Sequence, residues 1–594
     1  MLLLAALLIP HVAVANPQER DPPEPIRRWY DVRDVLSASR WDPENLVDMR
    51  PHLSSAWIHL IHEHRLLTHD GGATLELSDL LECVRGALWA NPEAEVDEIE
   101  GHAGRVVLVA NETAHAVAAR TIEVLREATA EAITVDVYRL DDDRIPRTTG
   151  SHLGAEEASR FVASAPGSLV ARERVRFGAP ATIADAEWTT VLYDYDSEVA
   201  QFVSSYDPIV TVVPSGIEIA VQVDRAADGR QFVVRTWGRD GAIDGKPRRL
   251  ELESMGNAPI ELPRVQTSLW TASAILEPGG ALVVDHDGGG RSALMVRVAA
   301  DGKVPAENEN VLPLGELGLT HMRLGLPDLG VAEPSGGLPV KEVTSPFEEP
   351  PWGYEVPPSI FVLDALKRVL DEGSASVLGA RALVFGPSPG QDEIRAGIDA
   401  ARKELRIGTI EVDVRYDLVP LTELAGVLDG GPAAFAAAAG ERLLGSVVEN
   451  DSLLLVGGVE WAYLHDYDIQ VAQSAIVGDP IIHGVFEGIA LWCAPFRTPE
   501  GRVSSWFDVR AQRSDEMLRG LATSITVLDE EERESPPGPL GTYEERLWIE
   551  LPVTHRASVR TRVEAREGEW ALVAARHVAE TDEALVVVAR MGER

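Results

Sequence analysis

The sequence predicts an α+β protein built as a tandem duplication, in which each copy is a small α/β module followed by a β-rich region. Two observations predict this fold class: similar landmarks recurring in the same order, and a change from helical to strand periodicity within each copy. The predicted segments are a signal peptide at 1–15, an N-terminal segment at 16–74, a first α/β module at 75–140, a first β-rich region at 141–300, a linker at 301–358, a second α/β module at 359–415 and a second β-rich region at 416–594.

The leader, Met1 to Ala15, is an apolar run that ends in Ala-Val-Ala. This pattern is typical of a secretory signal peptide cleaved after a small residue. A buried N-terminal helix is the alternative. No later apolar run reaches the roughly 18 residues that a transmembrane helix needs. The sequence therefore predicts an exported protein.

The duplication is predicted from matched landmarks that begin with YDSEVAQ at Tyr195 and YDIQVAQ at Tyr467, an offset of 272 residues. Further matches keep the same order along both copies. They are Val106–Ala110 with Ala382–Gly386, Glu187-Trp188 with Glu460-Trp461, Asp207-Pro208 with Asp479-Pro480, Gly216-Ile217 with Gly488-Ile489, and Ile260–Pro263 with Ile549–Pro552.

Each α/β module is predicted from helical spacing interrupted by short apolar strands. In the first copy these are helices at 78–88 and 113–129, capped by Ser78 or Asp79 and by Asn111, and strands at 106–110 and 133–138. In the second copy they are helices at 360–370 and 392–405 and strands at 382–385 and 410–414.

Each β-rich region is predicted from short alternating or apolar runs separated by turn residues. The first copy has such runs at 216–223 and 232–237, and a hairpin of 281–284 with 293–298 around Asp287–Gly290. The second has them at 559–563, 570–574 and 584–588, with 504–509 assigned only loosely. Proline and glycine make 301–358 a predicted linker, and the acidic, proline-rich stretch 529–539 a predicted exposed loop.

This organisation resembles the secretin family. The α/β module is similar to a secretin-associated N-domain, and the order of YDxxVAQ, Asp-Pro-Ile, a Gly-led strand and a Leu-Pro step is similar to the secretin homology region. Tyr30-Asp31-Val32-Arg33-Asp34 resembles the lead-in of some secretin-like proteins. The resemblance implies a ring-forming protein located in the periplasm or in the outer membrane and cell envelope and linked to protein secretion. Unlike a secretin, the chain has two β regions, and the proline-containing steps that help build a gate have no counterpart, so pore formation is left open.

The chemical motifs favour a protein that is not an enzyme. Gly386-Pro-Ser388-Pro-Gly390 fits a nucleophile elbow, but Pro389 has no N–H to offer an oxyanion. Five histidines between His52 and His69 include His59 and His62 at helical spacing; metal binding there is left open, and a solvated or interfacial helix face is preferred. We predict no catalytic, cofactor-binding or metal-binding residue and no cofactor. The acidic runs 93–100 and 529–534 are predicted to be solvated faces. The Tyr-Asp and Asp-Pro pairs are predicted to be turn and packing positions.

The net charge and the cysteine count limit the kinds of partner and of covalent link that the chain can have. The chain has 594 residues with 54 Lys+Arg against 95 Asp+Glu, a net charge of −41, which disfavours nucleic acid and anionic lipid surfaces. Its only two cysteines, Cys83 and Cys493, lie in apolar patterns and exclude a disulfide framework; they are predicted to be buried, with a bridge between copies as the lesser alternative.

We predict an exported, non-enzymatic, secretin-like envelope protein that acts in assembly or protein interaction, binding copies of itself or other envelope proteins by edge-strand and module packing. Association with the outer membrane is part of this hypothesis. The alternative is a periplasmic or surface binding protein with a ligand cleft between the two copies.

Overall fold

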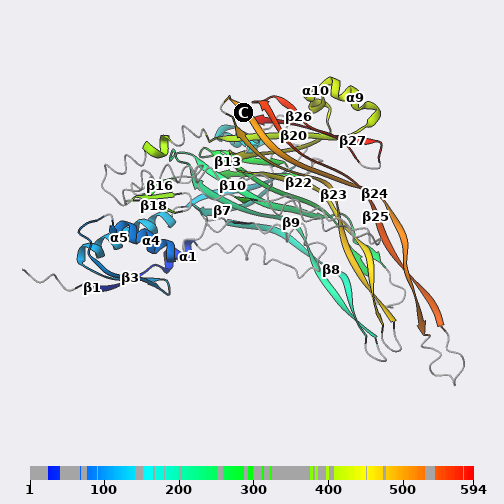
Figure 1. The fold of residues 1–594 in the computed structure, drawn as a ribbon, viewed down its shortest axis with the longest axis horizontal. Helices are drawn as coiled ribbons and strands as arrows, with labels where there is room; N and C mark the ends of the chain where they lie inside the picture. The colour runs from blue at the N-terminus through cyan, green and yellow to red at the C-terminus, as the bar shows by residue number, and fades with distance from the viewer. Residues whose placement is uncertain are drawn as a thin grey trace, which may run out of the picture.

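In a computed structural model, the chain is mostly β-sheet, with two wide antiparallel sheets and a smaller α/β unit (Figure 1). The residues that the structure describes are 25–39, 67–68, 77–89, 91–130, 132–141, 151–164, 168–178, 181–199, 204–250, 259–285, 292–298, 311–313, 322–323, 375–378, 381–384, 396–400, 407–449, 451–471, 476–498, 500–528, 542–578 and 581–593.

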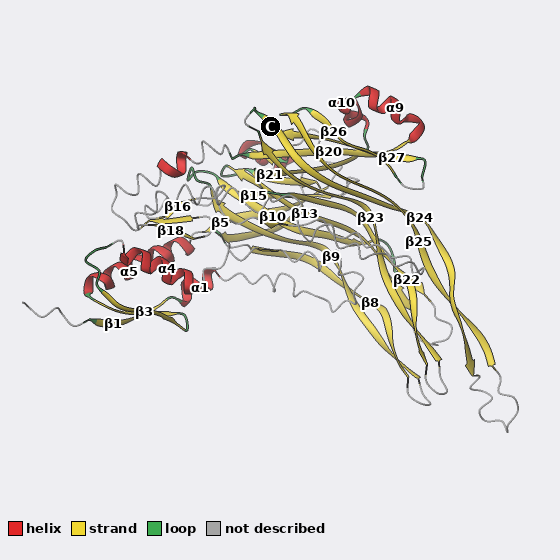
Figure 2. Cartoon of the chain, viewed as in Figure 1, coloured by secondary structure: helices red, strands yellow, loops and turns green. Residues whose placement is uncertain are grey.

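The small unit near the N-terminus packs its helices on one face of a three-stranded sheet (Figure 2). Strand β4 is central and pairs antiparallel with β1 and β3. Asn111 caps α5 as predicted, because its Oδ1 accepts a hydrogen bond from the Ala114 N–H at 2.9 Å. Helix α4 begins before Ser78, so that predicted cap is wrong. The elements are β1 (Ile26–Asp31), α1 (Arg33–Ser39), α4 (Leu77–Trp89), β3 (Val96–His102), β4 (Arg105–Ala110) and α5 (Glu112–Ala130).

The first wide sheet, called here the long sheet, has the order β25-β24-β23-β22-β13-β10-β9-β8. Its strands form hairpins whose outer parts extend beyond the rest of the molecule, toward the lower right of Figure 1. The strands are β8 (Ala181–Val199), β9 (Ser204–Arg225), β10 (Phe232–Ile243), β13 (Arg264–Leu276), β22 (Leu453–Val471), β23 (Ile476–Arg497), β24 (Arg502–Leu528) and β25 (Thr542–Arg566).

The second wide sheet, called here the short sheet, has the order β26-β27-β20-β21-β14-β15-β5-β7, with β6 also pairing with β14. The predicted hairpin of 281–284 with 293–298 is present as β14 and β15. The strands are β5 (Ala132–Asp141), β6 (His152–Leu153), β7 (Ser168–Arg176), β14 (Ala281–Asp285), β15 (Ser292–Val298), β20 (Thr409–Pro420), β21 (Glu441–Val448), β26 (Trp570–His577) and β27 (Glu583–Gly592).

One predicted boundary is wrong, because the strand at 133–138 does not belong to the small α/β unit. It forms β5, which pairs with β15 and β7 of the short sheet. The strand at 410–414 is likewise part of β20, which pairs with β21 and β27. Alternate side chains such as Val135 and Val412 are fully buried in the core between the two wide sheets, and this burial accounts for the assignment.

This main core contains residues from both halves of the β structure, which we define as residues 132–298 and 409–592. Trp270 and Phe232 of the first half pack in the same cluster as Phe507 and Leu491 of the second. Because the cluster is continuous across the halves, neither half buries its apolar face alone.

The remaining elements are short. Two of them, β16 and β17, lie inside the predicted linker, so that stretch is not wholly a linker. Strand β16 pairs with β19, which is also paired with β18. The elements are α6 (Ala155–Ser164), β2 (Leu67–Thr68), β11 (Arg248–Leu250), β12 (Ile260–Leu262), β16 (Val311–Pro313), β17 (Met322–Arg323), β18 (Ala375–Leu378), β19 (Arg381–Val384), α9 (Leu421–Gly430) and α10 (Pro432–Ala438).

The Asp-Pro pairs do not form the predicted turns. Pro208 lies inside β9 opposite Tyr195, and Pro480 lies inside β23 opposite Tyr467. Proline is tolerated there because β10 pairs with β9 only from Gly216 onward, so the outer part of β9 has a strand on one side alone. The two tyrosines are buried packing positions, as predicted.

The match of Glu187-Trp188 with Glu460-Trp461 is wrong by one residue. Trp188 pairs with Pro214, and the residue that pairs with Phe486, 272 positions after Pro214, is Glu460. The offset is therefore 272 along the whole hairpin, and a slip of one residue would exchange the two faces of the strand.

Several predicted features lie outside the described residues. They are the leader at 1–15, the helix at 360–370, most of the helix at 392–405, the turn at 287–290 and the loop at 529–539. The last of these connects β24 to β25, which pair from Leu528 with Thr542 back to Arg502 with Arg566.

Candidate functional site: the junction between the halves and the open sheet edges

Both wide sheets run from one half of the β structure into the other. In the long sheet, β13 of the first half pairs with β22 of the second, from Arg264 opposite Trp461 to Thr271 opposite Leu454. In the short sheet, β14 and β21 meet at Asp285 and Leu444. We call these contacts the internal junction. It is a continuous pair of sheets and not a cleft.

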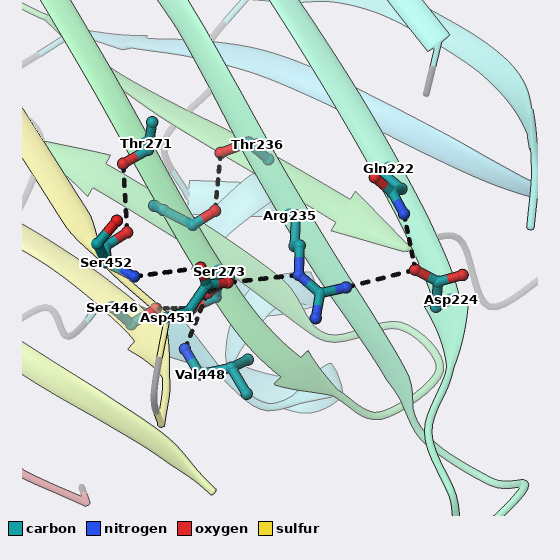
Figure 3. Close-up of polar contacts among 11 residues, drawn as sticks. Gln222, Asp224, Arg235, Thr236, Thr271, Ser273, Ser446, Val448, Asp451 and Ser452 are labelled. Atoms are coloured by element: carbon teal, nitrogen blue, oxygen red, sulfur yellow. Dashed lines mark hydrogen bonds and ion pairs between the residues drawn. The ribbon is translucent and has the colours of Figure 1, made fainter. Parts of the chain in front are cut away.

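A buried charged network lies at the internal junction (Figure 3). Arg235 of β10 contacts Asp224 of β9 through Nη1 at 3.4 Å and Asp451 of the second half through Nε at 3.3 Å. The side chains of Arg235, Asp224 and Asp451 are 5%, 1% and 9% exposed. An uncompensated charge at this depth would be costly, so each of these groups depends on its partners.

Ser273 of β13 extends this network to the second half. Its hydroxyl donates to Asp451 Oδ2 at 3.2 Å and accepts from the Val448 N–H at 2.8 Å. The Ser446 hydroxyl donates to the Ser273 carbonyl at 3.1 Å. A slip of either strand would break these bonds, so the network specifies how the halves align.

Thr271 adds a second link between β13 and the start of β22. The Leu454 N–H donates to Thr271 Oγ1 at 2.9 Å, and that hydroxyl donates to the Ser452 carbonyl at 3.3 Å. The groups gathered here are carboxylates, a guanidinium and hydroxyls that bond one another. Their arrangement accounts for the alignment of the strands.

The hairpins that flank the junction have matching geometry. Strands β8 and β9 have 19 and 22 residues, and β22 and β23 also have 19 and 22. Each hairpin has one register shift, between Leu192 and Asp194 in the first and between Leu464 and Asp466 in the second. Both second strands begin their next pairing at a glycine with positive φ, at Gly216 and Gly488.

The two wide sheets end in open edges. Within the described strands, β8 pairs only with β9 and β25 only with β24, at opposite ends of the long sheet. At the ends of the short sheet, β7 pairs only with β5 and β26 only with β27. Strands β7 and β8 are consecutive in the first half, and β25 and β26 are consecutive in the second. An unpaired edge offers backbone donors and acceptors to another strand.

The two edges of the long sheet differ in charge. Asp185 and Glu187 are exposed on β8, whereas the exposed side chains of β25 include Arg560 and Arg562. Arg560 contacts Asp508 at 3.0 Å, and Arg562 lies over the rings of Phe496 and Trp506 at 5.6 and 5.9 Å. One edge is therefore acidic and the other basic.

Most of the motifs weighed as chemical sites lie outside the described residues. Ser388 and the histidines from His52 to His69 lie outside the described residues. Cys83 and Cys493 are buried and unbridged, in different clusters of the core, and burial raises the Cys493 pKa well above its usual range. Among the described residues, no group of three or more His, Cys, Asp or Glu side chains is placed to hold a metal ion.

The residues of the internal junction escaped the sequence analysis. Arg235 is the one charged residue of Phe232–Trp237, a stretch whose apolar residues predict a strand. A charged residue inside an apolar strand is a usable signal, because it must find a partner once buried. Its partner Asp451 is 216 positions away, and no periodicity connects the two.

No family model matches the chain, and no curated protein matches it. Solved structures similar to it include the InvG secretin domain of the Salmonella SPI-1 injectisome (12% identity, 38% of this chain and 74% of that chain, TM-score 0.20), the type II secretin GspD of enteropathogenic Escherichia coli (10%, 39% and 83%, TM-score 0.19) and Aeromonas hydrophila ExeD (9%, 96% and 90%, TM-score 0.19). These scores are too low to define the fold, which rests on the strand order above. No helix in the described part of the chain is long and apolar enough to span a membrane.

Proposed function

We propose that the chain is an exported, non-enzymatic, secretin-like envelope protein that acts in assembly, and that its two halves are a tandem duplication. Its partners are further copies of itself or other envelope proteins, and its role is linked to protein secretion. The landmarks shared by residues 195–201 and 467–473, and the equal hairpins built around them, support the duplication.

One observation carries the assembly proposal: both wide sheets are continuous across the two halves and open at their outer ends. Strand pairing already joins β13 to β22, so the fold contains one working example of the contact that an edge strand can make. The alternative, a binding protein with a cleft between the copies, is not favoured, since the described junction is filled by paired strands and shared core.

The test is the mass of the purified full chain in solution. Light scattering after size exclusion, with and without detergent, is combined with negative-stain imaging. Oligomers of defined mass support the proposal, and ring-shaped particles support the secretin-like form of it. A 64.4 kDa monomer at all concentrations, in both conditions, would contradict self-assembly.

A further inference from the structure

We infer that copies of this chain join head to tail in a definite register, with β25 of one copy pairing antiparallel with β8 of the next as β13 pairs with β22 inside the chain. This inference rests on the proposed function and names its partner as a second copy of the same chain. The sequence and the strand registers of the two halves carry it.

The register follows from two correspondences. Leu453 of β22 corresponds to Ala181 of β8, because the two hairpins match at an offset of 272. Ser273 of β13 corresponds to Arg562 of β25, because they pair with Arg235 and Trp506. Those two residues pair in turn with Gln222 of β9 and Ala494 of β23, which are 272 positions apart. Inside the chain, Leu269 lies opposite Val456. The corresponding pair between chains is Ser558 opposite Ala184.

At its centre this register places like faces together, whereas the exposed Asp185 falls opposite Ala557, which is buried in the main core. Val559, which packs against the main core, falls opposite Ile183, a buried member of that core. Ser558 and Ala184 are both exposed. A shift of one residue would set Val559 against the exposed Ala184, so the apolar face of the combined sheet would be interrupted.

The two edges carry opposite charges, but these do not form direct cross-strand pairs. Asp185 and Glu187 are the charged residues of β8 between residues 181 and 189, whereas the opposite part of β25, residues 553–561, carries Arg556 and Arg560. In this register Asp185 and Glu187 fall opposite Ala557 and His555, and Arg560 lies on the other face of the sheet, because successive side chains of a strand alternate. Two like edges, β8 with β8, would repel.

The short sheet is consistent with the same direction of joining. Inside the chain, β21 of the second half meets β14 of the first. The corresponding strands are β7 and β26, the two open edges of the short sheet. Since β7 precedes β8 and β26 follows β25, both contacts form on the same pair of neighbouring copies. Such a heterologous contact produces closed rings when the rotation between copies closes.

The test is disulfide trapping between edges in the full chain. A184C and S558C are placed in one chain and also in separate chains that are then mixed. Directly opposite residues lie within the Cα separation that a disulfide allows, whereas diagonal neighbours lie farther apart. S558C combined with A186C is therefore the matched control. The unmodified chain controls for the buried Cys83 and Cys493.

We expect the double variant to give a ladder of linked chains under mild oxidation and the mixture to give linked dimers only, with the A186C control at least several-fold weaker. A linked monomer in place of the ladder would show that β8 and β25 pair within one chain and would overturn the inference. Oligomers by light scattering without the A184C–S558C link, or with a stronger link in the control, would also overturn it while leaving assembly intact.

A second measurement does not depend on new cysteines. Reversing both charges of the β8 edge, with D185K and E187K together, places two cations on the strand that would meet the basic β25 edge. We expect this variant to dissociate at a protein concentration about tenfold or more higher than the unmodified chain does. E156K, on the exposed surface of α6, is the control and leaves association unchanged. If the edge variant associates like the control, the pairing of β8 with β25 is wrong. If the unmodified chain is monomeric throughout, the proposed function fails first.

Discussion

The two halves of the β structure share a backbone plan but differ in the polar chemistry at the base of their hairpins. In the first half, Asp224, Arg235 and Ser273 occupy neighbouring positions on three strands and bond one another or Asp451. The corresponding positions of the second half hold Phe496, Trp506 and Arg562. There the guanidinium lies over two rings at the open edge.

At a second pair of corresponding positions, the arginine is the same in both halves but its partner differs. Arg225 of the first half lies over the Phe177 ring at 5.4 Å, whereas the corresponding Arg497 bonds Glu449, with Nη1 3.1 Å from Oε2. Apolar alternation and one glycine with positive φ, at Gly216 and Gly488, are alike in the two halves, whereas the polar partners are not. The hairpin geometry therefore depends on the apolar pattern and this glycine, and the polar residues are specific to each junction.

The largest expected effect is at Arg235. Replacing it in R235A leaves Asp224 and Asp451 buried without their shared cation, so we expect a loss of about 3–5 kcal/mol in unfolding free energy. The measurement is the urea midpoint followed by tryptophan fluorescence. R562A, at the corresponding position, is the control and should cost less than about 1 kcal/mol, since that side chain is exposed. Equal losses would show that the two positions are equally buried and would remove the contrast between the halves.

The next effect is at the glycines that the halves share. A Cβ on Gly216 would lie 2.1 Å from the Asp185 carbonyl oxygen, and one on Gly488 would lie 2.3 Å from that of Gly457. Both positions also have positive φ, so G216A and G488A should each lower stability by about 1–3 kcal/mol. The control G426A lies in exposed α9 with nothing near its Cβ and should be neutral or stabilising by up to about 1 kcal/mol. A large loss at only one glycine would mean that the halves bend differently.

The sequence predicted the local part of this plan. Helices α4 and α5, the β14–β15 hairpin and the strands containing Phe232 and Ile410 follow from periodicity and turn residues, which act over a few positions. The full lengths of β9 and β24 were missed, because polar residues and Pro208 interrupt the apolar pattern where only one neighbouring strand pairs. A strand paired on one side needs fewer buried side chains.

The candidate site was harder to predict from the sequence than the local structure was. Pairing of β13 with β22 joins positions almost 200 residues apart, and the Arg235–Asp451 contact depends on that pairing. The open edges are likewise a property of sheet order and not of any one strand. The sequence did supply the matched landmarks. These landmarks show which strands of the internal junction correspond to which strands at the outer edges.

The smallest expected effect is on the pH dependence of stability, and it distinguishes Arg497 from the corresponding Arg225. Burial raises the pKa of Glu449, so the folded state holds its proton more tightly than the unfolded state does. The stability that this group contributes is therefore present at low pH and is lost as pH rises from about 4.5 through the raised pKa. E449Q should flatten this part of the urea midpoint curve between pH 4.5 and 7. The control E593Q removes a carboxylate that also contacts Arg497 but is 78% exposed, and should leave the slope unchanged. If E449Q and E593Q change the slope alike, the buried Arg497–Glu449 pair does not distinguish the second half from the Arg225–Phe177 contact of the first.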